Sequence, residues 1–239
     1  MNYESLVIDC TKVFQGITKS YNMVKVRFDR RNEEDLAILQ AIETEAKKLA
    51  PSVNKQAASE TEKTRDTETL YANALAGMLS EHAWKHYLNS GVLQNGVTVS
   101  STESKTSINQ IDLLSSNGKT IEVRSSGVKN GIKFALCNSE HMFDILGPYT
   151  NGVKPTAIYK DIYLRTLFNY DLSKLVTIFK ENIIIVYLLG GATKSMMQDP
   201  TVYEIKSMKK DDPNGPEGSE YYSIKYSKAL DTIQITQTI

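Results

Sequence analysis

The spacing of hydrophobic side chains changes along the chain, and it predicts long helices first and mainly strands afterwards. Residues 33–50 place apolar side chains on one helical face, with Asn32 as the N-cap and acids in the first turn. Residues 69–91 repeat a helical spacing and end at Asn89-Ser90-Gly91, which is typical of a helix stop. We therefore expect two long helices in the first part of the chain.

Short apolar runs after this point predict strands. Residues 111–114 and 120–124 flank a turn at Asn117-Gly118, a pair that readily takes the positive φ of a β-hairpin. Residues 131–139 form a third apolar and alternating run, which predicts another strand. Residues 183–189, IIIVYLL, are continuously apolar and β-branched. That pattern is typical of a strand buried on both faces, so this strand is expected at or near the centre of a sheet.

The remaining segments are less uniform. Residues 157–168 fit either a strand or a helix, and residues 172–182 predict a helix that leads into the buried strand. Residues 190–197, GGATKSMM, predict a turn followed by a short helix. Residues 201–209 and 220–228 flank a polar loop and predict a terminal β-hairpin.

A polar segment divides the chain. Residues 51–68 begin with a proline and carry almost no apolar side chains, as a linker or an exposed loop does. We expect residues 1–66 to form a helical N-terminal appendage with its linker. Residues 67–239 are then expected to form an α/β core that ends in the β-hairpin.

Composition and charge exclude some classes of protein. With 239 residues and 41% hydrophobic content the chain can bury a substantial core. Its longest apolar run is far too short to span a bilayer, so no membrane partner is expected. Lys and Arg number 28, as do Asp and Glu, so any nucleic-acid surface would have to be local. Cys10 and Cys137 fit no metal or redox spacing, and a reducing, cytoplasmic setting is the expectation.

Two carboxylates stand out on the predicted hairpin. Asp112 begins its first strand, and Glu122 lies inside the second. Their spacing across the turn lets both side chains reach one spot, where they would repel each other unless a cation lay between them. A hard divalent metal ion satisfies this arrangement.

The order of elements around these acids resembles the PD-(D/E)XK nuclease superfamily, which has the restriction-endonuclease-like fold. In that pattern an aspartate begins one strand, a Glu-x-Lys triplet lies on the next, and a glutamate on a preceding helix often completes the site. Asp112, Glu122 and Glu81 match these three acids. The resemblance covers residues 70 to 200, and it implies an α/β fold with a mixed β-sheet flanked by helices.

The resemblance also implies a function. A member of this superfamily is expected to be a Mg²⁺- or Mn²⁺-dependent DNA endonuclease, here of the restriction or genome-defence type. The metal would be held by Asp112, Glu122 and the backbone carbonyl of Val123, whose side chain would point into the core. Because duplex cleavage involves two strands, a homodimer is expected.

Arg124 departs from the pattern, since the superfamily has lysine at that position. A guanidinium stabilises a phosphate bidentately but stays protonated and cannot act as a base. Three outcomes are open: Arg124 serves only as the electrostatic stabiliser, Lys129 or Lys133 replaces the lysine, or the site is inactive. We favour the first, because a metal ion alone can lower the pKa of a bound water. Lys129 and Lys133 are also candidate phosphate-binding residues.

Other interpretations compete with this one. Asp112 and Glu122 can be ordinary strand residues, with Arg124 as their ion-pair partner. The chain can also be a catalytically degenerate nucleic-acid-binding or assembly protein with the nuclease fold. A small-molecule enzyme of unrelated α/β type has only the Gly190-Gly191 pair in its favour.

Two further groups of side chains have ordinary explanations. His82 and His86 share a helical face, but they lack a metalloprotease motif and a third ligand, so a packing role is expected. Tyr221, Tyr222 and Tyr226 could stack on nucleic-acid bases, but strand packing explains them equally well.

Overall fold

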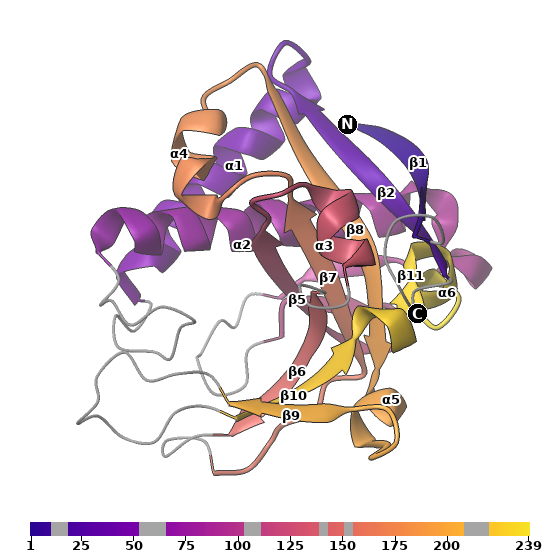
Figure 1. Ribbon diagram of the computed structural model, residues 1–239. Helices are drawn as coiled ribbons and strands as arrows, with labels where there is room; N and C mark the ends of the chain where they lie inside the picture. Colours follow the sequence, from indigo (N-terminus) through magenta and orange to yellow (C-terminus); the bar gives the residue numbers. More distant parts are fainter. Residues whose placement is uncertain (11–18, 53–65, 103–110, 139–142, 151–154, 208–219) are drawn as a thin grey trace.

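A mixed β-sheet forms the centre of the molecule (Figure 1). The computed structural model describes residues 1–10, 19–52, 66–102, 111–138, 143–150, 155–207 and 220–239. The strand order is β1-β2-β8-β7-β5-β4-β3, and β11 pairs with β8. The strands are β1 (Asn2–Asp9), β2 (Ser20–Asp29), β3 (Val99–Ser101), β4 (Leu113–Ser115), β5 (Thr120–Gly127), β7 (Ile162–Phe168), β8 (Ile183–Thr193) and β11 (Leu230–Asp231). Of these pairings only β5 with β7 is parallel.

A second, smaller sheet has the order β6-β10-β9. Its strands are β6 (Asp144–Thr150), β9 (Glu204–Ser207) and β10 (Glu220–Lys225), and all pairings are antiparallel. The predicted C-terminal hairpin is therefore confirmed as β9 and β10, with β6 added on the other side of β10. Strand β6 contacts β7, so this sheet lies against the parallel part of the main sheet.

Helices flank the main sheet, as expected for the α/β class. The long helices α1 (Glu33–Leu49) and α2 (Thr67–Tyr87) pack on each other and on one face of the sheet. The short helices are α3 (Ile132–Cys137), α4 (Leu175–Ile178), α5 (Lys194–Gln198) and α6 (Thr232–Thr236). A second hydrophobic cluster, which includes α3, fills the opposite face of the sheet. Figure 1 shows α2 and α3 on opposite sides of β5 and β7.

Several predicted elements are confirmed. Asn32 caps α1 and accepts a hydrogen bond from the Asp35 N–H, while β8 lies between β2 and β7 as a central strand. Gly118 has a φ of 88° in the β4–β5 turn, where its N–H donates to the Ser115 carbonyl at 2.9 Å. The positive φ explains why Asn-Gly marks this hairpin.

The expected helical appendage at residues 1–66 is corrected. Among the described residues of that range α1 is the one long helix, whereas β1 and β2 belong to the main sheet: β1 pairs with β2, and Val24–Asp29 of β2 pair with β8. Alternation in "YNMVKVRF" places Met23 and Phe28 on opposite faces, which are both buried. A strand covered on both faces has to lie inside a sheet. Residues 53–65 of the expected linker lie outside the described part of the chain.

Two strand-level expectations are also corrected. Residues 132–137 form helix α3, because Ile132, Ala135 and Leu136 have the i, i+3, i+4 spacing that buries one helical face. Gly190 and Gly191 continue β8 instead of forming a turn. A Cβ on Gly191 would lie 1.9 Å from the Tyr163 carbonyl oxygen, so glycine is required by the close approach of β7.

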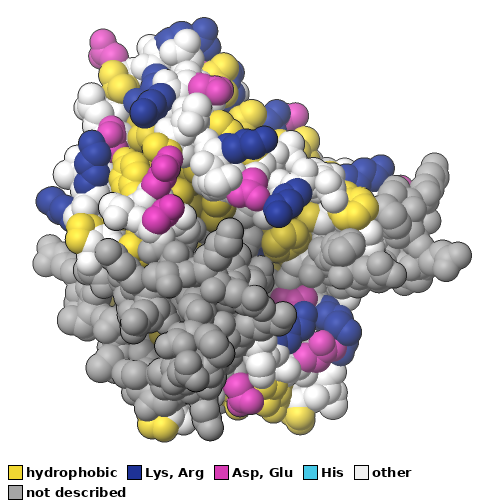
Figure 2. Space-filling view, turned by 60° about the vertical axis from the view of Figure 1, so that its left-hand side comes forward, with side chains coloured by type: hydrophobic (Ala, Val, Ile, Leu, Met, Phe, Trp, Pro, Cys, Tyr) yellow, Lys and Arg dark blue, Asp and Glu magenta, His cyan; other side chains and the backbone are white. Residues whose placement is uncertain are grey.

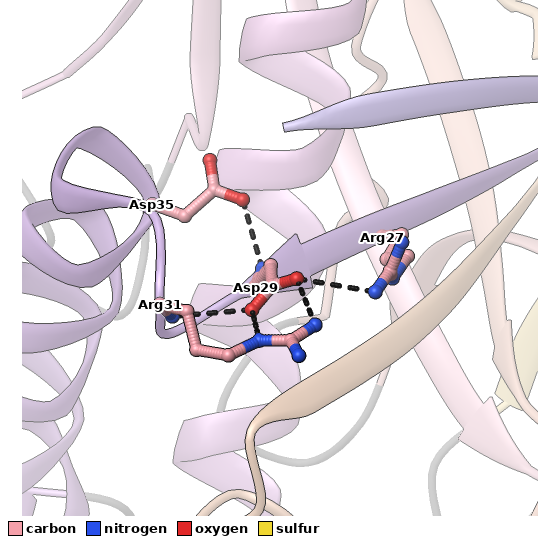
Figure 3. A network of polar contacts seen from close by, with 4 residues as sticks. All are labelled: Arg27, Asp29, Arg31 and Asp35. Carbon is pink, nitrogen blue, oxygen red and sulfur yellow. Dashed lines mark hydrogen bonds and ion pairs between the residues drawn. The ribbon is translucent and has the colours of Figure 1, made fainter.

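Ionic contacts hold the turn between β2 and α1 (Figure 3). The Asp29 carboxylate contacts the guanidinium groups of Arg31 at 2.6 Å and Arg27 at 3.1 Å. The hydrogen bonds from Arg31 hold the pKa of Asp29 well below its usual range. Asp35 accepts from the Asp29 N–H at 2.8 Å and also pairs with the amino group of Met1. The turn therefore fixes the start of α1 on the sheet.

Cys10 and Cys137 form a disulfide between the end of β1 and α3. Their Cα atoms lie 5.0 Å apart although 127 positions separate them in the sequence. Both residues are fully buried in the cluster around α3. Disulfides are rare in a reducing cytoplasm, so this pairing disagrees with the reducing setting inferred from the sequence.

None of the helices in the described ranges combines the length and the apolar character needed to cross a membrane.

Candidate active site

Helix α2 brings Glu81 against the main sheet. The helix is capped by Asp66, whose carboxylate accepts a hydrogen bond from the Thr69 N–H at 2.7 Å. Almost every side chain from Leu70 to Trp84 on its inner side is buried, and Glu81 is only 2% exposed. A buried carboxylate on a packed helix is held in one position.

Asp112 is held against the next strand of the hairpin. Its Oδ2 atom accepts a hydrogen bond from the Val123 N–H at 2.8 Å, so the carboxylate lies at the backbone between Glu122 and Arg124. Burial raises the pKa of Asp112 to about 6, and the charges of Glu122 and Glu81 act in the same direction. The Val123 N–H and Arg124 oppose this rise. The charges of Glu122 and Glu81 therefore both reach Asp112.

Glu122 and Arg124 lie on the opposite face of β5 from Ile121 and Val123. Alternation along the strand buries Ile121 and Val123 in the cluster that includes α2. The expectation that the Val123 side chain points into the core is confirmed. Glu122 and Arg124 form an ion pair, in which the Glu122 side chain is 13% exposed and the Arg124 side chain 37%. The charge of Glu122 raises the pKa of Arg124, which keeps the guanidinium protonated.

The two predicted phosphate-binding lysines lie beyond the end of β5. The Lys129 ammonium is 3.8 Å from Asp171 Oδ2, and its side chain is 82% exposed. Lys133 is exposed on α3. Both lysines follow Val123 by several residues in the sequence. Phosphate binding by either lysine stays a prediction.

Arg165 is a basic residue of this face that sequence reasoning missed. It lies on β7 directly opposite Arg124 in the parallel register, and it is only 4% exposed. One of its guanidinium nitrogens donates to Ser126 Oγ at 2.9 Å, and the guanidinium carbon lies 5.8 Å from the centre of the Phe143 ring. Residues 157–168 fitted strand or helix, so only the strand alternative could have placed Arg165 beside β5.

His82 and His86 have the expected packing role. His82 Nε2 lies 3.1 Å from Glu45 Oε2 and so joins α2 to α1, while the two imidazole rings stack at 6.2 Å. Burial lowers the pKa of both, to about 4 for His86. Within the described ranges, no group of three or more His, Cys, Asp or Glu side chains is arranged to hold a metal ion.

Charges of both signs are mixed on the surface. On the face that Figure 2 presents, Lys and Arg side chains alternate with acidic and hydrophobic ones over the described residues. This matches the equal numbers of basic and acidic residues in the whole sequence. Any attraction of this part of the surface for a phosphate backbone is therefore local.

Comparison with known proteins adds no relative: no family model, no curated protein and no solved structure matches this chain.

Proposed function

We propose that this chain is a divalent-metal-dependent DNA endonuclease, with Asp112 and Glu122 as its metal ligands. The observation that carries the proposal is the hydrogen bond from the Val123 N–H to Asp112 Oδ2. It joins the aspartate that precedes one strand to the Glu-Val-Arg triplet of the next. The nuclease pattern has an acid and a Glu-x-Lys triplet on paired strands, and here Arg124 takes the place of the lysine.

The order of the elements supports a restriction-endonuclease-like fold. Helix α2 carries an acid and packs on an antiparallel β3-β4-β5 meander. The chain then passes through α3 and through β6 of the second sheet, and it returns as β7, parallel to β5. The helix with Glu81, the hairpin with Asp112 and Glu122 and the later central strand β8 follow the order on which the resemblance rests, although the expected third strand is helix α3.

The donor chemistry fits Mg²⁺ or Mn²⁺. Asp112 and Glu122 are hard oxygen ligands, and their mutual repulsion contributes to the raised pKa of Asp112. The backbone carbonyl of Val123 is the third proposed ligand. When bound, the metal supplies polarisation of the phosphate and a lower pKa for a coordinated water. Glu122 would exchange its contact with Arg124 for the metal, which frees the guanidinium.

Each residue of the chain then has a separate task. Arg124 binds a phosphate oxygen and stabilises the added negative charge, because its guanidinium cannot accept a proton at neutral pH. Arg165, opposite Arg124 on β7, adds a second positive charge behind it. Glu81 is the helical acid of the pattern, and it would act through a metal-bound water in place of direct ligation. A homodimer would place two such sites on the two strands of a duplex.

The test is cleavage of supercoiled plasmid DNA with Mg²⁺ or Mn²⁺. Asp112→Asn and Glu122→Gln should each lower the rate by at least about a hundredfold, since each removes a metal ligand. Glu4→Gln is the matched control, because Glu4 is also a strand glutamate in an ion pair, with Lys25 at 2.8 Å, but lies on the edge strand β1. Wild-type rates in both active-site variants would refute the assignment.

One observation favours a second candidate function, a catalytically degenerate nucleic-acid-binding or assembly protein. Glu122 is engaged by Arg124, and this ion pair needs no metal to neutralise the carboxylate. Such a protein would bind DNA without cleaving it in any divalent ion. Cleavage restored by Arg124→Lys alone would then identify the arginine as the change that disabled an ancestral site.

A further inference from the structure

Two tyrosines form an aromatic stack on the second sheet. Tyr149 on β6 and Tyr221 on β10 are directly paired in the antiparallel register. Their ring centres lie 5.0 Å apart and the ring planes differ by 26°, which is a stacked arrangement. Both residues are half-buried, so each keeps part of its surface in solvent.

This stack borders the face of β5 that carries Glu122 and Arg124. Strand β6 contacts β7, which is the neighbour of β5 in the main sheet. Tyr163 and Leu167, on the face of β7 that continues from Glu122 and Arg124, pack in one cluster with Ile145 and Ile224 of the second sheet. Tyr221 acts on the pKa of Arg124 in the same direction as Glu122, whereas burial lowers that pKa. An aromatic surface therefore lies next to the cation that is proposed to bind the phosphate.

The other two tyrosines of this segment are occupied elsewhere. Tyr226 is 1% exposed and packs on Tyr21 at 4.7 Å between ring centres. Tyr222 contacts the rings of Tyr159 and Tyr203, because successive residues of a strand point to opposite faces. Of the three tyrosines that the sequence marked near the C-terminus, Tyr221 is thus the one that lies beside Arg124.

We propose that the Tyr149–Tyr221 stack binds an unpaired nucleobase of the nucleic-acid strand whose phosphate lies at Arg124. This inference rests on the proposed function and narrows its substrate to DNA that is single-stranded or locally opened. Aromatic side chains stack on any base, because every base has a π-face, whereas the bases inside a duplex are already stacked. The neighbouring guanidinium binds the phosphate that each nucleotide brings with it.

Binding of a fluorescent oligothymidylate of about a dozen nucleotides, measured by anisotropy with Ca²⁺ in place of Mg²⁺, tests the inference while a hard cation occupies the carboxylates and Arg124 is released. Tyr221→Leu should weaken binding roughly tenfold or more, because it removes the ring on which the base stacks. Tyr221→Phe keeps the ring and should bind within about twofold of wild type. Tyr222→Leu is the matched control on the other face of β10, and it should also bind like wild type.

An oligonucleotide with a single abasic position separates stacking from general packing. The abasic position is moved along the oligonucleotide, and at one of its positions it should weaken wild-type binding as much as Tyr221→Leu does. In the Tyr221→Leu variant that same abasic position should cause no further loss of affinity. A stack that only supports the fold would lower the thermal midpoint of Tyr221→Leu and leave its affinity unchanged, which would overturn the inference. Equal loss in Tyr222→Leu would overturn it as well.

The outcomes distinguish this inference from the proposed function. Cleavage of duplex DNA with no affinity for the single strand would refute the stacking site and leave the endonuclease intact. Tyr221-dependent binding without cleavage in any divalent ion would retain the stacking site and refute the endonuclease. Thymidine monophosphate that competes as well as the oligonucleotide would make the ligand a free nucleotide, which contradicts a site built for a strand.

Discussion

Burial disfavours the charged form of Asp112, so the stability of the protein should depend on pH. Because burial raises its pKa to about 6, above the value near 4 of an unfolded chain, its contribution to stability is complete below pH 4 and is lost as the pH rises through 6. Asp112→Asn removes that charge and keeps an oxygen that can accept from the Val123 N–H. At pH 7 without metal, this variant should be about 2 kcal/mol more stable than wild type.

Urea denaturation at pH 4 and pH 7 measures this difference. The gain from Asp112→Asn should be present at pH 7 and nearly absent at pH 4, where the wild-type carboxyl is protonated. Asp29→Asn is a contrasting control, since the pKa of Asp29 is lowered and its charge is favoured. An equal gain in stability at both pH values would show that the pKa of Asp112 is not raised in the folded protein.

Substitutions at Arg124 test which basic side chain binds the phosphate. Arg124→Lys should retain cleavage at roughly a tenth of the wild-type rate, because a point charge replaces a bidentate contact. Arg124→Ala should lose about a hundredfold or more, since the developing charge is then unsupported. Lys129→Ala and Lys133→Ala should cleave like wild type. If Lys129→Ala or Lys133→Ala abolished cleavage while Arg124→Ala had only a mild effect, that lysine would be the residue that binds the phosphate.

At the scale of residues, the sequence predicts some side chains of this site and misses others. Asp112 and Glu122 could be found because an Asn-Gly turn fixes how two short strands face each other. Arg165 and Tyr149 could not, since their neighbours lie on strands far away in the sequence. The ion pair of Glu122 with Arg124 agrees with the open alternative in which Arg124 is the ion-pair partner of the acids, because alternation along β5 puts both side chains on one face.

At the scale of elements, two glycines with opposite surroundings give a paired prediction. Gly191→Ala should destabilise the protein by more than about 3 kcal/mol or prevent folding, because the new Cβ would meet the Tyr163 carbonyl and separate β7 from β8. Gly77 lies within α2, and no atom lies within 4 Å of an added Cβ. Gly77→Ala should therefore stabilise by about 0.5–1 kcal/mol.

Thermal denaturation of the two variants tests this reading of the close approach. The midpoint of Gly191→Ala should fall well below that of wild type, while the midpoint of Gly77→Ala should rise by a few degrees. A Gly191→Ala variant that melts with the wild type would mean that β7 and β8 are not in tight contact at this point.

Periodicity identified the elements whose burial is simple, and it failed where two patterns coincide. Helices α1 and α2 and strand β8 follow directly from their apolar spacing. Residues 132–137 satisfy both alternation and helical spacing, and a run of six residues is too short for the sequence to decide between them. Gly190-Gly191 is typical of a turn, but the same residues are needed where two strands approach closely.

At the scale of the whole molecule, the disulfide joins the end of β1 to helix α3. It closes a loop across a separation of 127 residues, so in the chain-entropy account reduction should destabilise the protein by about 5 kcal/mol. Thermal denaturation with and without dithiothreitol measures this effect. The double variant Cys10→Ser, Cys137→Ser should melt at the lower temperature in both conditions, and two free thiols in the unreduced wild type would contradict the pairing.

The whole-molecule architecture was only partly visible in the sequence. The mixed sheet with flanking helices was predicted, whereas β1 and β2 were assigned to a separate appendage. β1 pairs with β2, but the other partner of β2, strand β8, is more than 150 residues away, and no local pattern carries that information. The Cys10–Cys137 contact is hidden for the same reason.

The central claim is that Asp112 and Glu122 together bind a divalent metal ion, and calorimetric titration with Mn²⁺ at neutral pH tests it most directly. Wild type and Glu4→Gln should bind with the same affinity, while Asp112→Asn and Glu122→Gln should each bind at least about tenfold more weakly, because each loses a carboxylate ligand. Binding that is absent from the wild type, or equal in all four proteins, would contradict the account.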